Sequence, residues 1–380
     1  MRKLFYEDPH LTRFCSKVTS CEACEKGYLI TLDATAFYPE GGGQACDIGT
    51  LGSVNVLDVR EKDGRILHLC DGALAVGETV DGQIDWARRF DLMQQHTGEH
   101  ILSGLIHDRF GYHNTGFHVG ADVMEVDFDG PISPDVLAEL EKQANEAVWQ
   151  NTPVKCWIPS PEELTGVTYR TKRELPWPVR IVQVGDVDSC ACCGIHVAHT
   201  GEVGLIKILS CVSLRGGVRL EMVCGGRAYR YMTEIFNQNR TVSQTFSAQI
   251  LQTGEAAQKM QDALAKEKFR TNHLQKQVFA YLSASYAGKE NVLHFEDSLE
   301  PAQVRELADS ISRVISGYVA VFSENGNGFS YCLATQNGDL RSLGKEMTQA
   351  LNGRGGGKPN FQQGNVNCTK NGIEAFFANR

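Results

Sequence analysis

The sequence lacks the segments that would direct a protein into a membrane or a secretory pathway. Its beginning, Met1 to Asp8, has no apolar stretch of the kind that a signal peptide carries. No run in the 380 residues approaches the roughly 18 apolar residues that a membrane-spanning helix needs. We therefore expect a cytoplasmic protein.

Basic residues are also too few for a protein that coats nucleic acid. Lys and Arg number 37 against 46 Asp and Glu, which gives a formal net charge of −9. This balance excludes a broadly basic surface but leaves room for a local basic track. Thirteen cysteines, an odd number spread over a long chain, argue against a disulfide framework and for reduced thiols.

A third absence is that of proline between residues 227 and 284. Because proline breaks helices, its absence permits a long helix there. Apolar residues recur at heptad-compatible steps through this stretch; they are Ile235, Val242, Phe246, Ile250, Met260, Leu264, Leu274 and Val278. A continuous helix would extend on the order of 85 Å, whereas a break at Gly254 would give a hairpin. Either form predicts a helical arm over residues 227–285, which could also form a dimer contact.

The rest of the chain divides into three regions of different pattern. Residues 1–88 contain short strand-like runs separated by Asp-Gly turns, which predict an antiparallel β-barrel. Residues 89–226 combine a helix from Asp91 to about Phe110 with several strands, so we expect an α+β core. Residues 286–380 alternate helices and strands like an α/β domain. The predicted fold class is α+β, with four domains.

Two histidine-containing pairs indicate a metal site in the core region. His96 and His100 are four residues apart, and so are Cys192 and His196. Imidazole and thiolate are the ligands that zinc prefers, and four of them complete a tetrahedral site. The first pair alone is also compatible with an ordinary surface helix. Cys193, next to Cys192, is a rival ligand.

The expected histidine helix contains two further residues of interest. Gly98 costs about 1 kcal/mol relative to Ala inside a helix, so we expect either a close approach by substrate or metal, or simple tolerance. Glu99 precedes the second histidine and is a candidate general base, although an exposed helix carboxylate is the favoured interpretation.

Two glycine-rich stretches stand outside the regular pattern. Gly41, Gly42 and Gly43 suit either a substrate-facing loop or a flexible hairpin tip. The second stretch, residues 353–364, is not a nucleotide-binding P-loop, because Asn352 and Pro359 occupy positions that require Gly and Ser or Thr.

Four motifs together resemble a known family. HTGEH at 96–100, CCGIHV at 192–197 and TAFYPEGGGQ at 35–44 resemble motifs of the alanyl-tRNA synthetase editing domain and of its free-standing relatives, the AlaX proteins. GGGKPNFQQG at 355–364 resembles the C-terminal domain of alanyl-tRNA synthetase. Nearly the whole chain is covered. The resemblance implies the long AlaX architecture: a barrel, a zinc-bearing editing core, a helical arm and a C-terminal tRNA-binding domain with a glycine-rich loop.

This resemblance implies a hydrolase that edits in trans, because no aminoacylation domain fits before residue 1. The expected reaction is deacylation of seryl-tRNA for alanine, with alanyl-tRNA spared; whether glycine is removed too is left open. A Zn²⁺ ion would be the cofactor and tRNA the partner. One departure is that CCGIHV replaces the family's CGGTHV, so Cys193 and Ile195 stand where the family has glycine and threonine.

The same resemblance assigns roles to further residues. Thr35 would contact the serine hydroxyl, and Gln44 would lie near the amino-acid pocket. The loop Gly41–Gly43 would face the substrate, while Arg354 and Lys358 would bind tRNA. Independently of the resemblance, the sequence offers local basic residues for phosphate contacts, although ordinary solvated charges are an equal alternative; they are Arg88, Arg89, Arg170, Lys172, Arg173 and Arg180.

The four-ligand site poses a chemical question. Four protein ligands would fill the zinc tetrahedron and leave no position for water. Either one ligand, with His196 the first candidate, binds weakly, or zinc orients the substrate while another group positions the water. The sequence leaves both alternatives open.

Two other functions fit part of the sequence. His96 to His100 also matches the HxxEH pattern of inverted-zincin metalloproteases, with Glu99 as base and Glu174 as third ligand. That function would leave the glycine-rich stretches and the cysteines unexplained. The other alternative is a non-catalytic tRNA-binding protein, which the intact ligand motifs disfavour.

Overall fold

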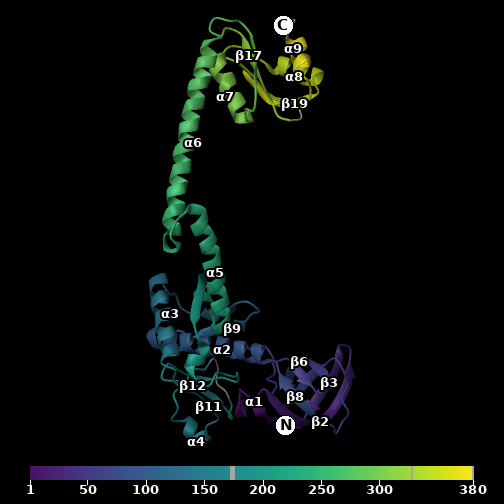
Figure 1. The fold of residues 1–380 in the computed structure, drawn as a ribbon, viewed down its shortest axis with the longest axis vertical. Helices are drawn as coiled ribbons and strands as arrows, with labels where there is room; N and C mark the ends of the chain where they lie inside the picture. The colour runs from purple at the N-terminus through teal and green to yellow at the C-terminus, as the bar shows by residue number, and fades with distance from the viewer. Residues whose placement is uncertain (172–175, 327, 379–380) are drawn as a thin grey trace. The chain divides into compact units, whose positions relative to one another are not determined.

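The computed structural model describes residues 1–171, 176–326 and 328–378, and the chain forms two compact units, Met1–Thr241 and Val242–Arg380 (Figure 1). Both units mix helices with sheets, so the predicted α+β class is confirmed. In the described part of the chain, no helix combines the length and the apolar character that a membrane crossing requires.

Six antiparallel strands close into a barrel in the order β2-β3-β7-β6-β5-β8. The barrel strands are β2 (Arg13–Cys24), β3 (Gly27–Leu32), β5 (Gly49–Leu51), β6 (Val54–Lys62), β7 (Arg65–Cys70) and β8 (Thr79–Ile84). At the turn between β6 and β7, Asp63 and Gly64 have φ values of 50° and 72°. Such positive values are what a two-residue hairpin turn requires, which is why Asp-Gly predicted this hairpin correctly. A short strand β1 (Arg2–Lys3) pairs with β4 (Ala34–Thr35), and α1 (Leu4–Glu7) follows β1.

The central helix α2 (Trp86–Phe110) begins five residues before the predicted start. Asp85 caps it, because its side chain accepts a hydrogen bond from the Arg88 N–H. Its last turn closes on Gly111, which has a left-handed φ of 70°. Within the helix, Arg89 is fully buried and forms an ion pair with Asp47. Arg89 is therefore part of the core, and its expected role in binding RNA is wrong.

Two small sheets and four further helical segments complete the core around α2. One sheet has the order β14-β15-β10-β9 and the other the order β11-β12-β13. The first comprises β9 (Asn114–Val119), β10 (Met124–Phe128), β14 (Ile206–Leu214) and β15 (Gly217–Cys224). The second comprises β11 (Val154–Trp157), β12 (Ile181–Val184) and β13 (Asp188–Ala191). The helical segments are α3 (Pro134–Trp149), α4 (Pro161–Leu164), η1 (Thr200–Val203) and the start of α5 (Gly225–Phe246). Helix α2 packs against α3, η1 and β13.

The predicted helical arm is interrupted. Helix α5 ends at Phe246, and after the short turn η2 (Ile250–Gln252) the chain continues as α6 (Thr253–Ala284). The interruption therefore lies before Gly254. It begins at Ser247, which adopts a left-handed φ of 50°. Several heptad residues, among them Met260 and Leu264, are more than half exposed within this chain.

The C-terminal unit contains one five-stranded sheet in the order β16-β17-β18-β20-β19. Its strands are β16 (Val292–Glu296), β17 (Tyr318–Glu324), β18 (Phe329–Thr335), β19 (Gly353–Lys358) and β20 (Phe361–Val366). Besides α6 and the end of α5, its helices are α7 (Pro301–Ser312), α8 (Arg341–Ala350) and α9 (Lys370–Phe377). The glycine-rich stretch that we expected to be a loop is the hairpin β19–β20. Glycine is required in it because a side chain at Gly355 would overlap the Tyr331 hydroxyl.

The glycine inside α2 has a packing role. A Cβ atom at Gly98 would overlap the Cys224 thiol of β15, so the close approach that we expected is made by the sheet rather than by substrate or metal. We predict that Gly98→Ala destabilises the first unit by about 1–3 kcal/mol, as overpacked cores do. The matched control is Gly226→Ala, because a Cβ there meets only ordinary contacts.

Urea unfolding followed by tryptophan fluorescence measures this change, because all four tryptophans lie between Trp86 and Trp177. Equal unfolding midpoints for Gly98→Ala and Gly226→Ala would contradict the packing role.

Candidate metal centre

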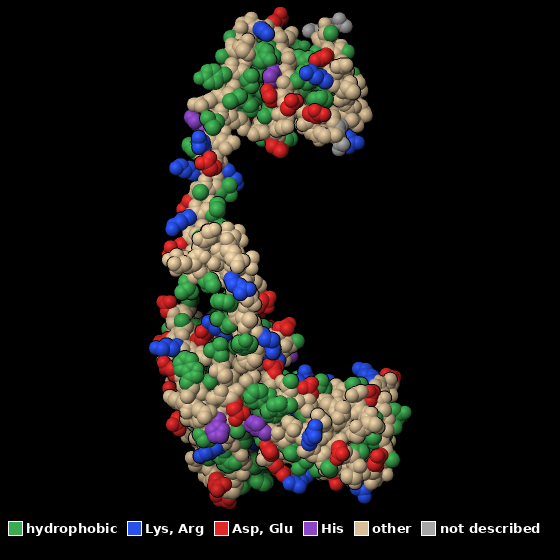
Figure 2. Space-filling view, viewed as in Figure 1, with side chains coloured by type: hydrophobic (Ala, Val, Ile, Leu, Met, Phe, Trp, Pro, Cys, Tyr) green, Lys and Arg blue, Asp and Glu red, His purple; other side chains and the backbone are tan. Residues whose placement is uncertain are grey.

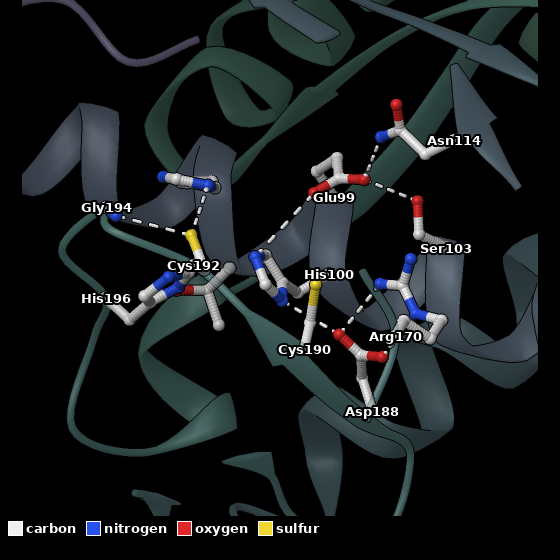
Figure 3. A network of polar contacts seen from close by, with 12 residues as sticks. Glu99, His100, Ser103, Asn114, Arg170, Asp188, Cys190, Cys192, Gly194 and His196 are labelled. Atoms are coloured by element: carbon white, nitrogen blue, oxygen red, sulfur yellow. Dashed lines mark hydrogen bonds and ion pairs between the residues drawn. The ribbon is translucent and has the colours of Figure 1, made fainter. Parts of the chain in front are cut away.

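The two predicted ligand pairs meet in the first unit. His96 and His100 project from one face of α2, and Cys192 and His196 lie in the turn after β13. Their ligand atoms all lie within 4.8 Å of one another, and the Cys192 sulfur is 3.4 Å from His96 Nε2 (Figure 3). The three histidines are each only 2 % exposed. The chain thus brings three buried imidazoles and one half-buried thiol to a single point.

The turn that carries Cys192 is held by hydrogen bonds to its backbone. The Arg180 guanidinium donates hydrogen bonds to the carbonyls of Cys192 and Gly194, at 2.9 and 2.7 Å. The Gly194 N–H donates in turn to the Cys192 sulfur at 3.3 Å. A Cβ atom at Gly194 would overlap the His96 ring, so only glycine allows this approach.

A hydrogen bond at Nδ1 orients each imidazole. His96 Nδ1 lies 2.8 Å from Gln44 Oε1, His100 Nδ1 lies 2.8 Å from an Asp188 carboxylate oxygen, and His196 Nδ1 lies 3.1 Å from the Thr97 hydroxyl. With these partners on Nδ1, the Nε2 atoms remain for the centre of the cluster.

His196 Nε2 is buried and has no hydrogen-bond partner among the described residues. An orphaned ring nitrogen beside a thiol and two further imidazoles fits a tetrahedral zinc ion, and partners on the opposite ring nitrogen are typical of histidine ligands.

Electrostatics within the cluster favour the ligand forms of Cys192 and His196. Burial raises the pKa of the Cys192 thiol, but the neighbouring His96 and His100 outweigh this and hold it well below its ordinary value. Burial, together with His96, lowers the pKa of His196, which keeps that imidazole neutral. Burial also lowers the pKa of His100, but Cys192 and Asp188 raise it well above its ordinary value. The raised pKa favours a protonated His100 imidazole, and a divalent cation that binds to the cluster would displace this proton.

A cavity of about 810 Å³ opens beside the cluster. His96, His100 and Cys192 line it, whereas His196 is not among the described lining residues. Of the predicted loop Gly41–Gly43, Gly42 lines the cavity. A Cβ atom at Gly42 would lie 2.9 Å from the Cys193 sulfur, and one at Gly43 would overlap Phe117. The loop is therefore packed into the cavity wall, and the Cys193 sulfur faces this loop.

Glu99 is buried, contrary to the favoured interpretation of an exposed carboxylate. It is 5 % exposed and lines the cavity next to His100. Its Oε1 accepts hydrogen bonds from the Ser103 hydroxyl and from the Asn114 amide (Figure 3). The periodicity of the sequence did not reveal this burial, because α2 is covered on most sides around residues 92–104.

Thr35 and Gln44 occupy different surroundings. Gln44 bridges the two halves of the cluster, because its Oε1 also accepts a hydrogen bond from the Ile195 N–H at 3.3 Å. Thr35 is fully buried, with its hydroxyl 2.9 Å from His68 Nε2 and accepting from the Phe37 N–H. Thr35 is not among the described residues that line the cavity. Its assignment to the serine hydroxyl stays a prediction.

Several arginines that we expected to contact RNA serve the site instead. Arg170 forms an ion pair with Asp188, the residue that orients His100, at 2.6 Å. Arg180 holds the cysteine turn, and its guanidinium lies 4.6 Å from the centre of the Tyr6 ring. Lys172, Arg173 and Glu174 lie outside the described residues. Sequence reasoning missed Asp188, since an aspartate two residues before a cysteine carries no recognisable signal.

Arg354 and Lys358 lie on the exposed strand β19 of the second unit. On the first unit, the Arg88 guanidinium donates a hydrogen bond to the Cys46 carbonyl at 3.0 Å. On the face shown in Figure 2, basic and acidic side chains are interspersed rather than gathered into one basic patch.

The fold and the cluster define a class of protein in which three buried histidines and one cysteine, a group that could hold a metal ion, lie beside a cavity. Two family descriptions match the chain: "Threonyl and Alanyl tRNA synthetase second additional domain" over residues 179–220, and "tRNA synthetases class II (A)" over residues 9–88. The first match covers the cysteine turn and the second covers the barrel.

Several known proteins are similar to this chain over nearly its whole length. The alanyl-tRNA editing protein AlaX-L of Pyrococcus horikoshii is 28 % identical, with 96 % of this chain and 95 % of that protein covered. The alanyl-tRNA editing protein Aarsd1 of Danio rerio is 26 % identical, with 95 % and 92 % covered. The alanine–tRNA ligase of Thermofilum pendens is 31 % identical, but this chain spans only 42 % of its length. The chain is thus similar, along nearly its whole length, to the alanyl-tRNA editing proteins AlaX-L and Aarsd1.

The position of the sulfur atoms decides between the two candidate thiol ligands. We predict that Cys192→Ala abolishes stoichiometric zinc binding, whereas Cys193→Ala retains one zinc per chain, because only the Cys192 sulfur belongs to the cluster. Metal analysis of the purified, dialysed variants measures this. Loss of zinc from Cys193→Ala with retention in Cys192→Ala would reverse the assignment.

The hydrogen bond from His100 to Asp188 has its own consequence. We predict that Asp188→Asn weakens zinc binding by about 10- to 100-fold, as the loss of such orienting partners does. Asp186→Asn is the matched control, because Asp186 lies two residues away and is exposed. Competition with a chromophoric chelator gives both affinities. Equal affinities of the two variants would exclude an orienting role.

Proposed function

We propose that this protein is a zinc-dependent deacylase that hydrolyses seryl-tRNA for alanine, acts in trans and spares alanyl-tRNA. The observation that carries the proposal is the convergence of His96, His100, Cys192 and His196 beside a cavity, in a chain related end to end to alanyl-tRNA editing proteins. These proteins act on aminoacyl esters, in which the acyl group is already activated. Hydrolysis therefore needs a positioned water more than a strong nucleophile.

The chain's own residues would prepare the site for this reaction. Gln44, Asp188 and Thr97 hold the imidazoles in one orientation, so little rearrangement accompanies metal binding. Zinc, when bound, supplies polarisation of the ester carbonyl and acidification of a nearby water. Phe117, Pro178 and Val179 give the cavity an apolar wall that limits bulk water.

The cavity bears on the question of the fourth ligand. His96, His100 and Cys192 face the cavity, whereas the described lining does not include His196. A ligand displaced by an incoming water should be one that the water can reach. We therefore favour His196 as a permanent ligand, which reverses the expectation from sequence that it would be the one to yield.

Selectivity for serine follows from a general property of polar sites. A site that hydrogen-bonds a substrate hydroxyl rejects the analogue without it far better than an apolar pocket can. Thr35 remains our candidate for this contact. To serve it, the Thr35 hydroxyl would exchange its bond to His68 for one to the substrate. A test of Thr35 should therefore compare the rates on seryl- and alanyl-tRNA rather than measure one rate alone.

The direct test uses tRNA for alanine charged with serine, glycine or alanine. We expect rapid clearing of seryl-tRNA, at least about 10-fold slower clearing of alanyl-tRNA, as a difference of about 1.4 kcal/mol gives, and loss of activity after removal of zinc by a chelator. Acid-gel separation of charged and free tRNA measures each rate, with Cys192→Ala as the metal-free control. Equal clearing of seryl- and alanyl-tRNA would contradict the proposal, and binding without deacylation would favour a non-catalytic tRNA-binding protein.

A further inference from the structure

Glu99 is a buried carboxylate that lines the cavity beside the metal-ligand cluster. Its Oε1 accepts from both Ser103 and Asn114, which fixes the side chain. The other oxygen, Oε2, lies 4.0 Å from His100 Nε2. Burial makes a carboxylate favour a cationic group close by. The structure therefore leaves an acceptor at the cavity wall.

Glu99 is also the only carboxylate among the described residues that line the cavity. The charged groups that share this lining are cationic: Lys3, Arg170 and Arg180. Arg170 is occupied by Asp188, and Arg180 donates to backbone carbonyls. Apart from the metal-ligand cluster itself, the described lining therefore offers a cationic part of a ligand one electrostatically favourable place, beside Glu99.

We propose that Glu99 binds the α-ammonium group of the aminoacyl ester and is not the general base. This inference rests on the proposed function, because it assigns the substrate class of the same site. In an aminoacyl ester the α-nitrogen is two bonds from the carbonyl carbon. A carbonyl held at the metal cluster thus brings the ammonium group near an oxygen that lies 4.0 Å from the ligand atom of His100. Recognition of a free α-amine separates aminoacyl-tRNA from N-blocked forms.

Two substrates that differ only in the amine test this role. The zinc-loaded full chain is given seryl-tRNA and N-acetylseryl-tRNA, in which the amine is neutral and blocked. We expect kcat/KM to be about 10- to 100-fold higher for the free amine, the range that one charge-assisted hydrogen bond gives. In Glu99→Gln, kcat/KM for seryl-tRNA should fall by the same factor, mainly through KM, and the preference should vanish. Glu25→Gln, an exposed carboxylate on the barrel, is the matched control.

Other roles of Glu99 give different results. A general base would lower kcat for both substrates equally in Glu99→Gln, and a role confined to positioning His100 would lower the zinc content as well. Either result overturns the inference. So does a wild-type protein that makes no distinction between the two substrates, which is an outcome that does not depend on the stability of any variant.

A binding measurement separates this inference from the proposed function. The probes are seryl-adenosine with a 3′-amide in place of the ester, which resists hydrolysis, and its N-acetyl form. Tighter binding of the free amine by wild type but not by Glu99→Gln supports the inference even if no tRNA is deacylated, in which case only the proposed function fails. Equal binding of the two probes by wild type overturns the inference even if seryl-tRNA is hydrolysed.

Discussion

The site depends on the contact between helix α2 and the turn that carries Cys192. Three imidazoles and a thiol cannot be buried together without partners, because each polar atom taken from water must regain a hydrogen bond or a metal bond. Gln44, Asp188 and Thr97 supply hydrogen bonds on one side of the imidazoles. The other side is left for a cation. The barrel, the helix and the small sheet are all needed, because each contributes at least one of these groups.

The glycines around the cluster show how closely these elements approach. Gly98 lets α2 lie against β15, Gly194 lets the cysteine turn lie against His96, and Gly42 lets the barrel loop lie against Cys193. In each case a single methyl group would overlap a neighbour or press against it. The ligand geometry is therefore set by the backbone as much as by the ligands. The glycine preceding Ile195 is retained here although Cys193 replaces the first glycine of the family motif.

The charged residues divide between structure and substrate in a way that composition did not reveal. Arg89 stabilises the junction of barrel and helix, Arg170 holds Asp188, and Arg180 holds the cysteine turn. Arg89 lies in the core, whereas Arg170, Arg180 and Glu99 line the cavity. Composition alone therefore does not indicate which charged groups face the cavity and which support the fold.

The sequence by itself determined the ligand types, their spacing and most regular elements. Local sequence patterns predict the hairpin at Asp63-Gly64, the helix of His96 and the strands on either side of the cysteine turn. Each of these elements depends on the turn chemistry or the periodicity of neighbouring residues. The tertiary structure alone decided which groups surround the ligands. Gln44 is 52 residues from His96, and Asp188 is 88 residues from His100. Burial of Glu99, the pairing of Arg89 and the engagement of Thr35 by His68 likewise arise from contacts between distant segments, which no local pattern encodes.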